Sequence, residues 1–311
     1  MTEQELQEKR RHKWRLDGRP ARTLDEAREF VESVGFALMF PLSPQQAKSG
    51  LAGGPGRPAV LAPTFVGAFV GADDRLPTWQ HAFEDARARE ATELMVRLLR
   101  ERAAFEANPF GETSLLVAAS IFPFYYALGG ERSAPGAKAQ ERSQKYSPLA
   151  HDAFAVIQRA GPLSKARMKE MLGGEPSSAA LDRALHELWS KLRITRVDYN
   201  PKEGASWDVL ARWAPEAVKE AVQLSVGEAL SALISKYLDC VVAAEAQEVE
   251  GFFAPLVARS KVKESVNALL ATRELSFVHV GHHSLVEVTP ARPVDPRRGP
   301  PLPRRKKASP A

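Results

Sequence analysis

The sequence predicts a mainly α-helical protein with small β-hairpins, organised in its second half as a tandem winged helix-turn-helix array. Apolar residues recur at helical spacing along much of the 311-residue chain. Short alternating segments around turn residues follow groups of helices. One order of helices and hairpin also occurs twice. A chain of this length is expected to form more than one domain.

The first 146 residues are predicted to be helical with one irregular segment. Thr23 and Glu26 have the spacing of a capping box, so a helix is expected over 24–34. Glycine and proline recur through 43–77 and exclude any long element there, although short strands near 65–70 would fit. A further helical segment is expected over 79–107, and a helix or a buried segment over 114–128.

The second half follows a clearer order. Capping and breaking residues separate three helices that the apolar spacing predicts, over 149–159, 165–172 and 179–191. The segment 194–199 then alternates like a strand, and 207–210 returns after a turn. Three helices followed by a hairpin is the order of a winged helix.

The same order recurs after a bridging helix over 215–224. Apolar positions of the third helix repeat at an offset of 81 residues, so that Leu181, Leu185 and Leu188 are matched by Val262, Val266 and Leu269. The strand that follows repeats at the same distance. Because chance periodicity would not also preserve the distance from helix to strand, we interpret this as a repeat of whole units.

These observations divide the chain into five predicted parts. They are a basic amino-terminal helix or arm over 1–22, a helical domain over 23–146, winged-helix modules over 147–224 and 225–289, and a disordered basic tail over 290–311.

A helix-turn-helix places the amino-terminal part of its third helix in the major groove, so outward polar side chains there are candidate DNA contacts. In the first module these are Ser177, Ser178, Arg183, His186 and Lys191; in the second they are Ser260, Lys261, Lys263 and Asn267. Carboxylates share these faces and oppose phosphate binding: Glu175, Asp182, Glu187 and Glu264. Modules that serve only packing or protein contacts are the alternative.

Histidines gather in the second hairpin. His282 and His283 are predicted to contact phosphates or the minor groove at the tip of the wing. A metal site would need three or four converging ligands, whereas adjacent residues of a tight turn point apart. We therefore expect neither a metal nor any other cofactor.

Composition indicates an ordinary globular protein, with 44% hydrophobic and 26% charged residues. The net charge is +5, but seven basic residues against one acid lie beyond residue 289, so the rest is close to neutral. That tail would anchor phosphates or merely aid solubility. One cysteine, no membrane-length apolar run and no secretory signal predict a cytoplasmic protein without a membrane partner.

Two further clusters offer chemistry. Gln80, His81 and Glu84, beside Trp79, carry groups for acid-base catalysis, with packing of the tryptophan as the alternative. The aromatic run over 122–126 would stack on bases or, more commonly for such a density, lie in the core.

The segment 23–41 ends Val-Gly-Phe-Ala-Leu-Met-Phe-Pro. With the Trp79 segment, the Arg-Leu-Leu-Arg helix over 97–100 and the two modules, it resembles the AlkZ/YcaQ crosslink-repair DNA glycosylases. The resemblance implies tandem winged helices that cradle duplex DNA and cleave N-glycosidic bonds of alkylated or crosslinked purines. It implies a Gln-x-Gln or Gln-x-Asp motif before the proline, where this chain has Leu38, Met39 and Phe40. Leu38 and Phe40 cannot orient a water.

The sequence therefore predicts a duplex DNA-binding protein related to this repair family, without assigned catalytic residues, and a monomer is favoured. An active glycosylase that uses Gln80, His81 or Glu84 is the first alternative. A winged-helix transcriptional regulator is the second, and it would be expected to dimerise over two half-sites.

Overall fold

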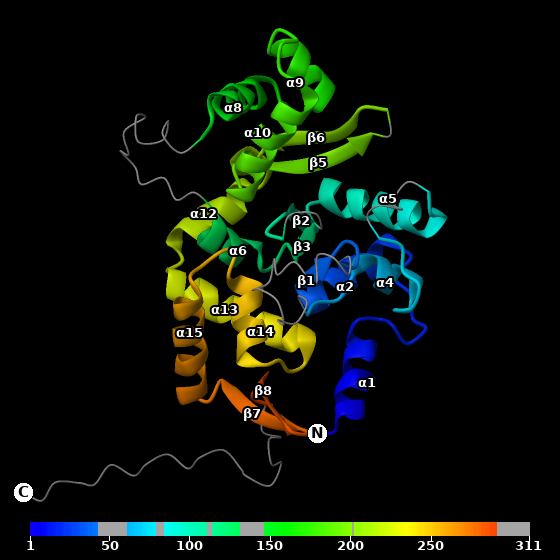
Figure 1. Cartoon of the computed structure of the whole chain (residues 1–311), viewed down its shortest axis with the longest axis vertical. Helices are drawn as coiled ribbons and strands as arrows, with labels where there is room; N and C mark the ends of the chain where they lie inside the picture. Colours follow the sequence, from blue (N-terminus) through cyan, green and yellow to red (C-terminus); the bar gives the residue numbers. More distant parts are fainter. Residues whose placement is uncertain (43–60, 79–83, 111–113, 131–145, 201, 291–311) are drawn as a thin grey trace, which may run out of the picture.

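The computed structural model describes residues 1–42, 61–78, 84–110, 114–130, 146–200 and 202–290 (Figure 1). They form a mostly helical molecule with small antiparallel strand pairs. Three consecutive segments share one element order, and we call them unit 1 (24–118), unit 2 (148–209) and unit 3 (226–288).

Unit 1 pairs helices with a three-stranded sheet of order β1-β3-β2. Its elements are α2 (Leu24–Val34), β1 (Phe36–Leu38), α4 (Phe65–Val70), α5 (Ala86–Arg100), β2 (Ala104–Ala107) and β3 (Leu115–Ala118). Both strand pairs are antiparallel, with Leu38 opposite Leu115 and Phe105 opposite Val117. The capping box of Thr23 and Glu26 at the start of α2 is confirmed.

Two expectations for this region were wrong. Residues 65–70 form a helix rather than strands, because the Thr64 hydroxyl accepts from Gly67 N at 3.1 Å and caps the first turn. Gly71 ends that helix at φ +82°, a conformation that suits glycine. The helical segment expected over 79–107 ends at Arg100, and 104–107 form the strand β2 instead. The apolar run over 114–128 is a mostly buried segment that forms β3 followed by α6 (Phe122–Gly129).

Unit 2 repeats this order with a sheet β4-β6-β5. Its elements are α8 (Pro148–Ala160), β4 (Leu163–Ser164), α9 (Lys165–Met171), α10 (Ser178–Ser190), β5 (Ile194–Asn200) and β6 (Gly204–Val209). In units 1 and 2 alike, the first strand of the unit pairs with the last. The predicted helices and hairpin over 149–210 are confirmed to within a few residues.

Unit 3 contains α13 (Val226–Val241), α14 (Ala246–Phe253), α15 (Arg259–Ala271), β7 (Leu275–Val280) and β8 (His283–Val288). A single antiparallel bridge from Ala244 to Val286 occupies the place of its first strand. Two short helices join units 2 and 3, α11 (Leu210–Trp213) and α12 (Pro215–Gln223).

The apolar positions that predicted the repeat face the interior. Leu181, Leu185, Leu188, Val262, Val266 and Leu269 are all buried. Units 1 and 3 share one hydrophobic core, to which α6 contributes by packing against α12 and α13. Unit 2 has a core of its own. The molecule is therefore a two-unit body with unit 2 attached to it.

The amino-terminal helix α1 (Glu3–Lys13) packs on unit 3 rather than on the residues that follow it (Figure 1). Leu6 lies in a small apolar cluster with Val280 and Leu285 of the last hairpin. Arg10 is buried and donates to Val241 O and Ala243 O at 2.9 and 2.7 Å. These contacts bridge sequence-distant ends of the described chain.

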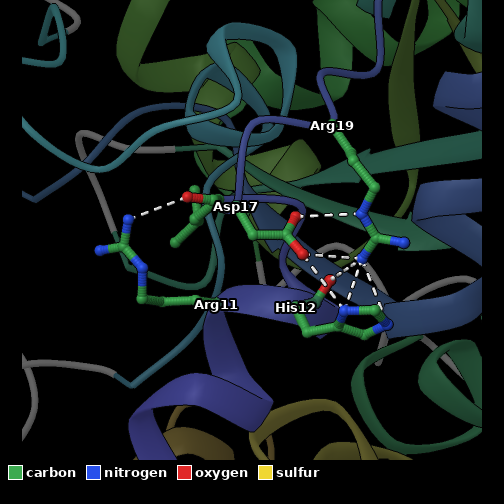
Figure 2. Close-up of polar contacts among 5 residues, drawn as sticks. Arg11, His12, Asp17 and Arg19 are labelled. Atoms are coloured by element: carbon green, nitrogen blue, oxygen red, sulfur yellow. Dashed lines mark hydrogen bonds and ion pairs between the residues drawn. The ribbon is translucent and has the colours of Figure 1, made fainter.

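Polar contacts also connect the end of α1 with the segment that follows it (Figure 2). Arg11 forms an ion pair with Asp73 at 3.0 Å. Asp17 accepts from Arg19 at 2.9 Å, and this hydrogen bond is the main cause that lowers the pKa of Asp17. His12 lies 3.2 Å from Asp17. The arm thus connects unit 3 with unit 1.

Candidate nucleic-acid interface

Each unit exposes one face of its third helix, α5, α10 or α15. All eleven side chains predicted to contact DNA are exposed: Ser177, Ser178, Arg183, His186, Lys191, Ser260, Lys261, Lys263, Asn267, His282 and His283. Five of them lie on α10 and its ends in unit 2; in unit 3, four lie on α15 and two at the tip of the β7–β8 hairpin. Their role in binding DNA stays a prediction.

On α10 the carboxylates expected to oppose phosphate binding have partners. Asp182 accepts from Lys165 Nζ at 2.9 and 3.1 Å. Glu187 accepts from the backbone and hydroxyl of Ser147 at 2.9 and 2.7 Å. Arg183 makes no ion pair within the described residues. Lys165 therefore balances the charge of Asp182, whereas Glu187 keeps its negative charge on this face.

On unit 3 the cations lie at the start of α15 and the histidines at the hairpin tip. Lys261 and Lys263 are exposed in the first two turns. The hairpin turns at Gly281 and His282, where Gly281 takes φ +59°, as a two-residue turn requires. His283 Nδ1 lies 3.0 Å from Glu245 Oε1, so this ring already has a partner.

The third helix of unit 1 was not among the predicted sites. Arg89 and Arg97 of α5 are exposed and, within the described ranges, form no ion pair. The two other arginines of its exposed face are engaged, Arg87 by Asp85 and Arg100 by Asp198. The hydrogen bond with Arg87 lowers the pKa of Asp85 to about 2, so this carboxylate is ionised at neutral pH.

A common pattern emerges from these positions. Each third helix, or its C-cap, carries two exposed cations that have no ion-pair partner in the described part of the chain. They are Arg89 and Arg97 on α5, Arg183 and Lys191 on α10, and Lys261 and Lys263 on α15. The pairs lie at different positions along the three helices, but each can bind an anion without first breaking a salt bridge.

The residues at the expected place of a catalytic motif lie in the core. Leu38 ends β1, and Leu38, Met39 and Phe40 are buried. Glu84 is exposed, whereas Trp79, Gln80 and His81 fall outside the described residues. The structure therefore does not relate Glu84 to these three.

The aromatic run over 122–126 lies in the core rather than on a nucleic-acid surface. Phe122 stacks on Phe105 with ring centroids 4.0 Å apart. Tyr125 is fully buried, which raises the pKa of its hydroxyl. Where the chain is described, no helix has the length and apolar character needed to cross a bilayer, and no three metal-binding side chains gather.

Fold and surface together define a mainly helical protein in which one small αβ unit occurs three times. No protein-family model matches the sequence, and no curated protein matches it. Among solved structures, the chain is similar to the Streptomyces sahachiroi DNA glycosylase AlkZ. That similarity has a TM-score of 0.50 at 12% identity and covers 90% of this chain and 69% of the other. It shows a distant relationship to the AlkZ fold.

Proposed function

We propose that this protein binds duplex DNA in a repair-related role, through winged-helix units whose third helices face the DNA. The observation that carries the proposal is that each third helix, or its C-cap, carries two exposed cations without an ion-pair partner in the described residues, in three units of one element order. The fold similarity to a protein named a DNA glycosylase supports the same reading.

The chemistry of these helices suits a polyanion. Lysine and arginine neutralise phosphates and release condensed counterions, which gives affinity without sequence preference. Serines at the start of α10 and α15, and Asn267 further along α15, can add neutral hydrogen bonds to phosphates or base edges. The hairpins β5–β6 and β7–β8 follow α10 and α15 in the chain, and we propose that they serve as the wings.

We further propose that the protein does not cleave glycosidic bonds by the Gln-x-Gln route that the family resemblance implies. Hydrolysis needs a polar side chain that orients water near the anomeric carbon. Leu38 and Phe40, which stand at those positions, are apolar and buried. A glycosylase that uses Gln80, His81 or Glu84 is the competing function, and the similarity to the fold of a DNA glycosylase favours it.

Binding is tested by fluorescence anisotropy with a labelled duplex at several salt concentrations. Lys261→Glu with Lys263→Glu should lower affinity about tenfold or more and flatten the slope of log Kobs against log[salt] by roughly 2, because each lost phosphate contact removes about 0.9. The matched control, Lys9→Glu with Lys219→Glu, changes the charge equally at exposed sites on α1 and α12. Equal loss in both pairs would contradict a site on α15.

Catalysis is tested separately. Purified protein is incubated with duplexes that carry alkylated purines or an interstrand crosslink, and abasic sites are quantified. No release above the protein-free control is expected. Release that disappears in Gln80→Ala or His81→Ala would establish the competing function. A monomer in sedimentation would further favour repair over a dimeric regulator.

A further inference from the structure

We infer that α5 and the β5–β6 hairpin of unit 2 form one continuous surface for duplex DNA, on which Arg89 and Arg97 bind backbone phosphates. The inference rests on the proposed function and deepens it, because it joins α5 of unit 1 with the hairpin of unit 2; the sequence predicted a helix over 79–107 but assigned it no DNA contact. On this inference, units 1 and 2 contact the duplex through a single shared surface.

The hairpin of unit 2 is fixed to unit 1 beside α5 (Figure 1). Arg100 of α5 donates to Asp198 Oδ1 of β5 through Nε and Nη2, at 2.7 and 2.6 Å. Deeper in the contact, Arg196 of β5 donates to Glu106 Oε1 and Ser114 Oγ at 2.5 and 2.9 Å. The two surfaces therefore have a defined relative position.

The contact between unit 2 and unit 1 also includes a largely buried part around Trp189 and Glu106. Trp189 donates its indole N–H to Glu106 O at 3.0 Å, and the Arg196 guanidinium lies 4.3 Å from the Trp189 ring centroid. Glu106 is only 3% exposed. Because this ion pair is largely desolvated, it resists displacement by salt better than the exposed Arg100–Asp198 pair.

In this arrangement α5 contacts both β2 of its own unit and β5 of unit 2, and these two strands also contact each other. Lys202 is exposed at the turn of the β5–β6 hairpin and donates its backbone N–H to Asn200 Oδ1 at 2.9 Å. A duplex that lies along α5 would meet this turn as well. Contacts from two units would then add without an extra cost of ordering one unit against the other.

The charges of α5 determine which of its groups can reach phosphate. Arg89 and Arg97 are about 12 Å apart along the helix, since each residue rises ~1.5 Å. Glu90 and Glu93 lie between them and are exposed, so the face is not uniformly positive. Discrete phosphates can be contacted by such separated guanidinium groups, each of which donates several hydrogen bonds in one plane.

The test compares three double variants by duplex anisotropy across a salt series. Arg89→Glu with Arg97→Glu should lower affinity tenfold or more and reduce the salt slope by about 2. Arg89→Lys with Arg97→Lys keeps the charge, so the salt slope should stay unchanged and the affinity should fall less than in the glutamate variant. Arg22→Glu with Arg159→Glu is the matched control, at exposed arginines that form no ion pair in the described ranges.

A fourth variant tests whether the surface is continuous. Lys202→Glu alone should lower affinity several-fold and reduce the salt slope by about 1. Loss only in the α5 variant, with Lys202→Glu unchanged, would overturn the single surface.

The outcomes separate this inference from the proposed function. If the protein binds duplex and the α5 variant binds like the Arg22 and Arg159 control, the inference is overturned while DNA binding by α10 and α15 stands. If the unmodified protein binds no duplex, both fail. Circular dichroism of each variant verifies that the exposed substitutions leave the fold intact.

Discussion

Arg10 illustrates how one side chain can complete an element far away in the sequence. The last carbonyls of a helix have no partner within it. Arg10 donates to Val241 O and Ala243 O at the end of α13, and Trp14 donates its indole N–H to Cys240 O at 2.8 Å. Burial lowers the pKa of Arg10, but an arginine remains charged at neutral pH, so its charge strengthens both hydrogen bonds.

Replacing this side chain tests its contribution. Arg10→Met should reduce the free energy of unfolding by about 2–4 kcal/mol, because two carbonyls are left buried without donors. Urea denaturation gives the value. Arg11→Met is the matched control, since the exposed pair of Arg11 with Asp73 is worth only about 0–1 kcal/mol. Similar losses for the two variants would contradict this account of Arg10.

At the scale of single elements, a serine at the start of a helix can either cap that helix or contact DNA. Ser177 was predicted to contact DNA, and in the structure its hydroxyl accepts from Ala180 N at 3.2 Å and caps α10. Ser178 is equally exposed, and no hydrogen bond of its side chain is described. Substituting Ser177 and Ser178 one at a time therefore distinguishes an effect on helix stability from an effect on DNA binding.

Ser177→Ala should destabilise the protein by about 1 kcal/mol, the usual cost of losing an N-cap. Ser178→Ala should change stability by less than about 0.5 kcal/mol. Thermal unfolding followed at 222 nm measures both. Equal effects would mean that the cap of Ser177 contributes nothing beyond its neighbour.

The helices of units 2 and 3 could be predicted because their signals are local. Ser164, Ser177 and Ser225 all act as N-caps, and the buried leucines and valines of the third helices follow helical spacing. The exposure of the predicted polar residues follows from the same spacing, since positions off the apolar stripe face water.

Unit 1 could not be recognised in this way. Its first strand has three residues, all of them buried, and therefore shows no alternation. A segment rich in glycine and proline separates β1 from α4, and only pairing between distant strands, β1 with β3, reveals the common order. The site on α5 was missed for the same reason, because a third helix can be named only after its unit is recognised.

At the scale of the whole molecule, unit 2 depends on a few polar contacts for its position. Its core is separate from the core that units 1 and 3 share. Glu106 of β2 is buried and its charge is balanced by Arg196 of β5. Removing one partner of such a pair leaves an uncompensated buried charge.

Arg196→Met should therefore destabilise the protein by about 3–5 kcal/mol. Combining it with Glu106→Leu should restore part of the loss, because no charge is then left buried. Arg100→Met, which breaks an exposed pair at the same contact, should cost less than about 1 kcal/mol. Hydrogen exchange of β5 and urea denaturation report these changes, and a double variant no more stable than the single one would refute the electrostatic explanation.

The contact of α1 with unit 3 has a consequence for how the chain is made. Arg10 and its acceptor Val241 are 231 residues apart, and Leu6 meets Val280 and Leu285, which are still later in the chain. At a synthesis rate of about 5–20 residues per second, α1 leaves the ribosome roughly 10–50 s before α13 is complete. During that interval its apolar side has no native partner, so docking of this helix belongs to the final stage of folding in the cell.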